Sequence, residues 1–150
     1  KVIVTSEKMA FWWSKTGVPN SKMVLIPYGI DIDLFKPILN VRRELRIPQH
    51  KKLLLYVGRM SPEKGVMFLI AAVSLLCNKW GNIELHVIGS GIQQKHLQDL
   101  ICQLGIEQQV IFHGQIQKSK LPIYYSAADL TILPSLSEGL PRTMIEGNDS

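Results

Sequence analysis

Short apolar runs alternate with stretches of helical period along most of the chain. From residue 53 onward, each apolar run has the length of a buried strand and is followed by an amphipathic segment. The predicted strands are Leu53–Val57, Leu85–Ile88, Val110–Phe112 and Leu130–Leu133, and the predicted helices are Gly65–Cys77, Ile92–Leu104, Leu121–Ala127 and one from Pro141 onward. This order predicts an α/β fold, with a Rossmann-like parallel sheet and helices on both faces.

The residues before this repeat carry a shorter version of the same pattern. The predicted segments are a strand at Lys1–Thr5, a helix at Glu7–Lys15, a strand at Met23–Ile26, a loop over Pro27–Pro37 and a short helix at Val41–Arg46. The first helix carries Met9, Trp12 and Trp13, which we expect to be buried in part. The chain opens inside a strand and stops at Ser150 soon after a helix has begun, which we interpret as a fragment.

The composition is that of an ordinary folded domain. A length of 150 residues suits about one domain, with 46% hydrophobic and 19% charged residues. The net charge of +5 favours phosphates or anionic surfaces, but the basic residues are scattered and no recognised nucleic-acid-binding module accompanies them. We therefore expect no nucleic-acid partner. No apolar run reaches the roughly 18 residues that a membrane span needs.

The two cysteines, Cys77 and Cys102, both lie in apolar helical patterns. Neither belongs to a Cys-x-x-Cys or Cys/His spacing that would indicate a metal site. We expect two buried, reduced thiols in a cytosolic protein, and no bound metal.

The loops that follow the predicted strands are the place to look for chemistry, because ligands bind at the carboxyl ends of parallel strands. The segment Gly58–Gly65 comes after the first strand of the repeat, and it sets Arg59 and Lys64 beside a helix N-terminus. Two cations and free backbone amides suit a diphosphate. The alternative is a solvated loop with two surface cations. The segment is not a P-loop, because the required glycine and lysine spacing is absent.

Two further loops are weaker candidates. Gly89-Ser90-Gly91 would let a ligand approach the backbone, or would simply make a tight turn. Gln94 stands where a dinucleotide fingerprint needs its third glycine, which disfavours a dehydrogenase. His113-Gly114-Gln115-Ile116 suits a pocket for a flat base, although for His113 itself a plain hydrogen-bonding role in a loop is the favoured interpretation.

The stretch from Pro134 to Glu146 is the most informative. Glu138 lies in a strand-to-helix loop, Pro141 suits the first position of a helix, and Glu146 follows about a turn and a half later. We expect the two carboxylates to lie near one another at the rim of the sheet, where a carboxylate can accept hydrogen bonds from a diol. Taken singly, Glu138 could be a helix-dipole partner and Glu146 could lie on a solvated helix face.

These two glutamates are separated by seven residues, and the spacing resembles the E-x7-E motif of retaining glycosyltransferases with the GT-B fold, most closely family 4. Further segments resemble the family in the expected order: Pro27-Tyr28-Gly29-Ile30-Asp31 with Phe35 and Pro37, Gly58-Arg59 with Lys64-Gly65, Gly89-Ser90-Gly91, Phe112-His113-Gly114 and Ala128-Asp129. The resemblance covers nearly the whole chain.

The resemblance implies roles for individual residues. Arg59 and Lys64 would bind the donor diphosphate, Glu138 would contact the transferred sugar, and Glu146 would hold the ribose hydroxyls. The implied catalytic residues are Arg59, Lys64 and Glu138, and the implied donor-binding residues are Gly58, Gly89, Gly91, His113, Gly114, Ile116, Gly139, Leu140, Arg142 and Glu146. The reaction would need no metal or other cofactor, and UDP-, GDP- and ADP-sugars all remain open as donors.

The resemblance also implies a domain organisation. Residues 1–36 would be the end of an N-terminal acceptor domain with the interdomain crossover, and residues 37–150 would be a partial, truncated C-terminal domain that binds the nucleotide sugar. The acceptor, a glycan or a lipid-linked glycan, would be held by the missing domain, so the fragment alone would bind nucleotide and would be inactive. A cytoplasmic location is expected, with peripheral association at the inner face of the membrane left open.

The sequence differs from the family pattern at two places, and three other classes of protein are alternatives to a glycosyltransferase. Leu140-Pro141 replaces a common Phe-Gly, and Gly147-Asn148-Asp149 is a polar run that weakens the last helix. The rivals are a dehydrogenase or other nucleotide-binding Rossmann domain, a non-catalytic member of the same fold, and a phosphate-binding interaction module.

Overall fold

The mostly apolar runs of the sequence form one parallel sheet. The computed structural model describes residues 1–138 and 141–148. Its strands β3 (Lys52–Val57), β4 (Ile83–Ile88), β5 (Val110–Gly114) and β6 (Leu130–Thr131) are arranged in the order β5-β4-β3-β6, all parallel. The two central strands β3 and β4 are covered on both faces, which explains their nearly continuous apolar sequences.

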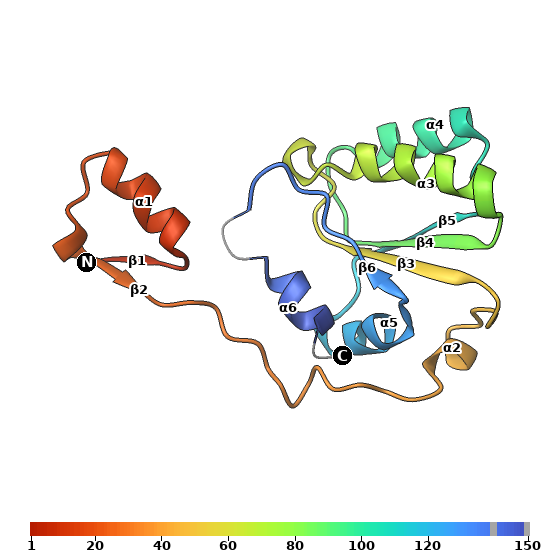
Figure 1. Cartoon of the computed structure of the whole chain (residues 1–150), viewed down its shortest axis with the longest axis horizontal. Helices are drawn as coiled ribbons and strands as arrows, with labels where there is room; N and C mark the ends of the chain where they lie inside the picture. The colour runs from red at the N-terminus through yellow and green to blue at the C-terminus, as the bar shows by residue number, and fades with distance from the viewer. Residues whose placement is uncertain (139–140, 149–150) are drawn as a thin grey trace.

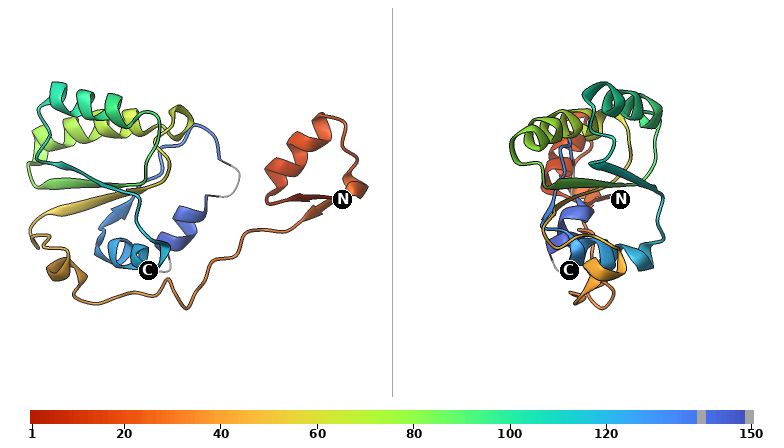
Figure 2. Two further views of the ribbon diagram at one scale, coloured as in Figure 1. Left: turned by 180° about the vertical axis from the view of Figure 1, so that it is seen from behind. Right: turned by 90° about the vertical axis from the view of Figure 1, so that its right-hand side faces the viewer.

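Helices cover both faces of this sheet, as predicted (Figure 1). On one side lie α3 (Val66–Trp80) and α4 (Gln94–Leu104), and on the other lie α2 (Val41–Glu44), α5 (Leu121–Ala127) and α6 (Arg142–Asn148). Figure 2 shows the same two layers from behind and from the side. Single turns of 3-10 helix occur at Asn20–Lys22, Pro62–Lys64 and Lys118–Lys120.

The alternation of side chains along β3 divides the core between these layers. Leu54 and Tyr56 belong to the cluster packed against α3 and α4. Leu55 and Val57 belong to the opposite cluster, which includes Tyr125 of α5. The sheet is therefore held firmly from both faces, and the loops at its carboxyl ends are fixed at one rim.

Asp129 ties the edge strand β6 to β3. Its carboxylate accepts a 2.7 Å hydrogen bond from the backbone N–H of Leu53, and it also pairs with Arg42 and Lys52. Partial burial works against ionisation, but these hydrogen bonds outweigh it and hold the pKa of Asp129 below its ordinary value. The Ala128-Asp129 pair of the sequence pattern thus has a structural role at the start of β6.

A separate two-stranded parallel sheet precedes this domain (Figure 1). It pairs β1 (Val2–Val4) with β2 (Met23–Leu25), and α1 (Glu7–Lys15) connects the two strands. The expected partial burial of both tryptophans was wrong. Trp12 is 64% exposed, Trp13 is exposed too, and only Met9 is half-buried, because two short strands offer too little surface to cover the helix.

Three details differ from the sequence predictions. The ladder of β6 ends at Thr131, although the amide of Ile132 still donates to Leu55 at 2.8 Å. β5 runs on to Gly114, so His113 lies in the strand. The prediction of two buried thiols was wrong, because Cys102 is exposed and Cys77, although it packs against the core cluster, is only half-buried.

Candidate functional site

The loops after β3, β4 and β5 are joined to one another by backbone hydrogen bonds. The amide of Met60 donates to Ser90 at 3.0 Å, and the amide of Gly89 donates to Gly114 at 2.7 Å. A Cβ on Gly89, whose φ is +130°, would lie 1.9 Å from the carbonyl oxygen of Gly58, and one on Gly91 would lie 2.2 Å from that of Met60. Both glycines are therefore required by close contact between loops, whatever else they do.

Tyr56 supports this rim from below. It is fully buried in β3, and its hydroxyl donates a 2.7 Å hydrogen bond to the carbonyl oxygen of Arg59. A Cβ on Gly58 would lie 2.7 Å from that hydroxyl, so the chain passes directly over the ring. Burial raises the pKa of Tyr56, which stays a neutral donor. Sequence reasoning missed this residue, since it reads as one more large side chain in an apolar run.

Two cavities open at this rim and share the wall Val57-Gly58-Arg59. The first, here named the Ile116 cavity, has a volume of about 430 Å³ and is completed by Ile88, Gly89, Ser90, Gln115, Ile116 and Leu121. The second, here named the Lys64 cavity, has a volume of about 460 Å³ and is completed by Lys64, Leu133, Glu138, Pro141, Arg142 and Thr143.

An ion pair forms one wall of the Lys64 cavity. Nζ of Lys64 lies 2.6 Å from Oε1 of Glu138, and the two side chains are only 17% and 24% exposed. Burial works against ionisation of Glu138, but the hydrogen bond and charge of Lys64 outweigh it and hold its pKa below the ordinary value. A fixed cation and an ionised carboxylate thus face the same cavity.

Arg59 adds a second cation, held more loosely. Its guanidinium lies 3.5 Å from Oε1 of Glu63, and its side chain is 75% exposed. Because Arg59 lines both cavities, its charge lies where they meet. The structure therefore brings together the three predicted catalytic residues, Arg59, Lys64 and Glu138.

Glu146 lies deeper than expected. It is 6% exposed, which excludes the alternative of a solvated helix face, and it is among the residues that line neither cavity. The hydroxyl of Tyr125 donates to its Oε2 at 3.1 Å, and Nη2 of Arg142 lies 4.0 Å from its Oε1. Arg142 does line the Lys64 cavity, so Glu146 is connected to the site only indirectly, by its contact with Arg142 on α6. Sequence reasoning missed Tyr125, whose role depends on a helix–helix contact.

The side chain of His113 contacts His86 and Tyr124 below the rim of the sheet. Its Nε2 lies 3.0 Å from Nδ1 of His86 on β4, and its ring meets that of Tyr124 edge-on. Burial, and next the neighbouring His113, lower the pKa of His86 to about 4, and burial lowers the pKa of His113 as well. Both rings are thus held neutral, and neither lines the two cavities. Sequence reasoning missed His86, a single polar residue between Leu85 and Val87.

The remaining predicted donor residues divide into three groups. Gly58, Gly89 and Ile116 line the Ile116 cavity, and Arg142 lines the Lys64 cavity. Gly91 and Gly114 take part in the backbone contacts between the loops. Gly139 and Leu140 lie outside the described residues.

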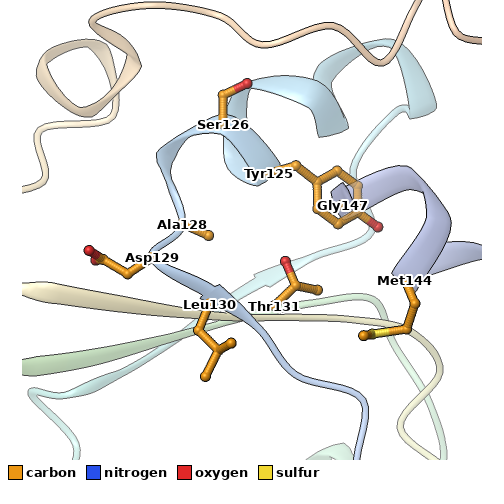
Figure 3. A pocket seen from close by; sticks show the side chains of 8 residues that line it. All are labelled: Tyr125, Ser126, Ala128, Asp129, Leu130, Thr131, Met144 and Gly147. Carbon is orange, nitrogen blue, oxygen red and sulfur yellow. The ribbon is translucent and has the colours of Figure 1, made fainter. Parts of the chain in front are cut away.

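A third cavity, of about 260 Å³, lies at the other end of β6 (Figure 3). Its walls come from α5, the start of β6 and α6, with Asp129, Thr131 and Met144 among the lining side chains. It opens where β6 begins, away from the loops that carry Lys64 and Glu138, and we do not count it as part of the candidate site.

Residues 1–138 and 141–148 contain no group of three or more His, Cys, Asp or Glu side chains arranged to hold a metal ion. Within the same ranges, none of the helices has both the length and the apolar character to cross a membrane.

The parallel Rossmann-like sheet, with Arg59 and Lys64 in its strand-end loops, matches the C-terminal domain of solved GT-B structures. The chain belongs to the glycosyl transferases group 1 family, whose model matches residues 38–149. Among curated relatives, it is 30% identical over 149 residues to a lipopolysaccharide 1,2-N-acetylglucosaminetransferase of Salmonella typhimurium, with 92% of this chain and 38% of the relative covered.

Solved structures of other proteins have the same fold as this chain. Sucrose-phosphate synthase from Thermosynechococcus elongatus superimposes with a TM-score of 0.86 at 30% identity, over 97% of this chain and 37% of that one. HepE of Anabaena, solved in complex with UDP-glucose, superimposes with a TM-score of 0.86 at 26% identity, over 97% and 41%. The chain spans between 29% and 38% of the length of the first curated relatives.

Proposed function

We propose that the whole protein is a retaining glycosyltransferase of family 4, which moves a hexose-type sugar from a nucleoside-diphosphate sugar to an acceptor. The observation that carries the proposal is the ion pair between Lys64 and Glu138 in the wall of a cavity at the carboxyl ends of the strands. With Arg59 on the shared wall, this cavity offers two cations and a carboxylate to one ligand. A diphosphate linked to a sugar matches that arrangement.

The donor would lie across both cavities. Its base would rest in the Ile116 cavity, its diphosphate beside Gly58 and Arg59, and its sugar in the Lys64 cavity against Glu138. The volumes of about 430 and 460 Å³ support this arrangement, because each accommodates one ring system of the donor. The HepE neighbour with bound UDP-glucose, which has the same fold, supports the nucleotide class. UDP-, GDP- and ADP-sugars all remain candidates.

The proposed chemistry follows from the charges. As the bond from the anomeric carbon to the diphosphate breaks, negative charge grows on the leaving oxygen and positive charge grows on the sugar ring. Lys64 would offset the first charge with little reorganisation, because Glu138 already sets its position, and the exposed Arg59 would add a second positive charge. Glu138 would accept hydrogen bonds from the sugar hydroxyls. Glu146, held by Tyr125, lines neither cavity and would act on the donor through Arg142, which lines the Lys64 cavity.

The acceptor side belongs to a larger protein in this proposal. Residues 1–36 would be the end of an acceptor domain with the crossover, and residues 37–150 the donor-binding part. The Salmonella relative, named for lipopolysaccharide, supports a glycan or lipid-linked glycan as the acceptor. No cofactor is needed in this scheme, since the two cations supply the charge compensation.

The direct test is the product of the full-length protein. Proton NMR would follow the anomeric signal formed from UDP-, GDP- and ADP-hexoses, with water or a glycan as acceptor. The proposal expects one donor class to be consumed and the first product to keep the α or β configuration of its donor. A product of inverted anomeric configuration would refute the retaining mechanism. Absence of turnover together with absence of nucleotide binding would refute the proposal that the protein is a glycosyltransferase.

A further inference from the structure

Glu138 is held from two sides. Its carboxylate is paired with Lys64, on the side of the four-stranded sheet. Its backbone carbonyl oxygen accepts a 3.2 Å hydrogen bond from Nζ of Lys8, which lies on α1, 130 residues earlier in the chain. The side chain and the main chain of one site residue are therefore fixed by different parts of the molecule.

The partner of this carbonyl belongs to the N-terminal unit. Figure 1 shows β1, α1 and β2 set apart from the four-stranded sheet and joined to it by a long segment without helix or strand. The later part of this connection is anchored in the domain core by the buried Phe35, but a stretch without helix or strand before it does not by itself fix how the two parts face one another. The hydrogen bond from Lys8 is thus a specific tie between the N-terminal unit and the site.

The hydrogen bond between Lys8 and Glu138 lies next to a small cavity, and a second contact joins the connecting segment to the site. Lys8, Met9 and Trp12 of α1 enclose about 180 Å³ against Ser137 and Glu138. Glu138 consequently separates this small cavity from the Lys64 cavity, since it lines both. The connecting segment adds a contact of its own, because the guanidinium carbon of Arg142 lies 5.5 Å from the centre of the Tyr28 ring.

We propose that Lys8 is a positioning residue, which uses its hydrogen bond to the Glu138 carbonyl to make the geometry of the donor site depend on the placement of the N-terminal unit. The ammonium group is directed at the main chain of Glu138 rather than at its carboxylate. It therefore sets where the Glu138 backbone lies while Lys64 sets the carboxylate. The inference rests on the proposed function for its catalytic consequence, but the contact can be tested without it.

The test uses Lys8→Met in the full-length protein, which removes the ammonium and keeps most of the stem. Lys15→Met is the matched control, because Lys15 lies on the same helix and its ammonium is over the ring of Phe11. Lys8→Arg is the rescue variant, since it restores a charged donor. The first readout is hydrogen exchange of the Leu136 amide, which lies in the same loop as Glu138 and donates at 2.9 Å to the backbone carbonyl of Glu63. We expect exchange to accelerate in Lys8→Met only.

The second readout separates positioning from donor binding. Lys8→Met should lower kcat by roughly three- to tenfold, the range for loss of one charge-assisted hydrogen bond, and should leave the donor KM within about twofold. Lys8→Arg should recover most of the rate. Unchanged exchange in Lys8→Met would overturn the inference even if the protein proved inactive. A donor KM that rises as much as kcat falls, or an Arg variant that recovers nothing, would overturn it as well.

Discussion

Nζ of Lys64 and Oε1 of Glu138 lie 2.6 Å apart, at the wall of the cavity proposed for the donor sugar and diphosphate. The same cation is assigned to the leaving diphosphate. A bound diphosphate must therefore share or take the ammonium that Glu138 holds, and the carboxylate repels the incoming phosphates. This relationship makes binding and transfer respond differently to removal of the charge on Glu138.

Replacing Glu138 by Gln should strengthen the binding of the free nucleoside diphosphate while it weakens sugar transfer. Without the carboxylate charge, Lys64 is released to the phosphates, and affinity should rise about three- to tenfold, as for a partly exposed ion pair. Transfer should fall about a hundredfold, because the sugar hydroxyls lose the charged carboxylate to which they donate. Calorimetry and steady-state kinetics on the full-length protein measure the two effects, with Glu107→Gln as a surface control. Weaker diphosphate binding in the Gln variant would contradict the shared cation.

Removal of Lys64 should affect the chemical step most. Lys64→Ala should lower kcat about a hundredfold, which corresponds to the roughly 3 kcal/mol that one preorganised contact contributes to the transition state. Arg59→Ala should act in the same direction. Lys79→Ala, an exposed lysine near the end of α3, is the control and should leave the rate unchanged. A near-normal rate in Lys64→Ala would remove this residue from the mechanism.

The buried carboxylate of Glu146 should depend on Tyr125 for stability. Tyr125→Phe removes the hydroxyl that donates at 3.1 Å, which leaves the carboxyl group of Glu146 with one donor fewer in a buried setting. We expect the free energy of unfolding to fall by about 1–2 kcal/mol, measured by urea denaturation. Tyr124→Phe, on the same helix, should change it by less than about 0.5 kcal/mol. Equal losses in the two variants would mean that the Tyr125 hydrogen bond contributes nothing specific.

The buried pair of His86 and His113 predicts a stability that falls in mild acid. The pKa of His86 is about 4 in the folded chain against an ordinary value of 6.5, so the unfolded chain binds the extra proton as the pH falls from 6.5. The stability contributed by neutral His86 is complete above pH 6.5 and is lost progressively towards pH 4, by about 3 kcal/mol in all.

The titratable groups around His86 determine the pH range in which the stability of the variants should be compared. Glu84, on the same strand, lies 3.7 Å from Nε2 of His86 and pairs with Lys51, while His113 faces Nδ1 from β5. Carboxylates titrate below about pH 5, so the comparison belongs between pH 6.5 and 5. Denaturation of His86→Gln should show a flatter pH dependence there than the parent, and the exposed His96→Gln should not differ from it. A parent whose stability is constant over this window would contradict the buried neutral pair.

Much of the fold could be predicted from the apolar runs. Leu53–Val57 and Leu85–Ile88 are too apolar for strands with one wet face, and they lie at the centre of the sheet. Because the carboxyl ends of parallel strands share one rim, Arg59, Lys64 and Glu138 could be expected to meet there, and they do.

What the pattern could not predict depends on neighbours from elsewhere in the chain. Tyr56 and His86 are isolated polar groups within mostly apolar strands, and their partners lie in a loop and on another strand. Glu146 was expected at the rim, but its depth follows from the packing of α6 on α5, which the helical period of a polar segment does not encode. Trp12 reads as a core residue, and its exposure reflects how little sheet its helix has to cover.

The central claim is that the two joined cavities form a nucleotide-sugar site in which Lys64 is required, and calorimetric titration of the full-length protein with UDP-, GDP- and ADP-sugars tests it most directly. The account predicts that one donor class binds, that Lys64→Ala weakens its binding at least about tenfold, and that Lys79→Ala binds as the parent does. A folded protein that binds none of the three donors, or that binds one equally well without Lys64, would contradict it.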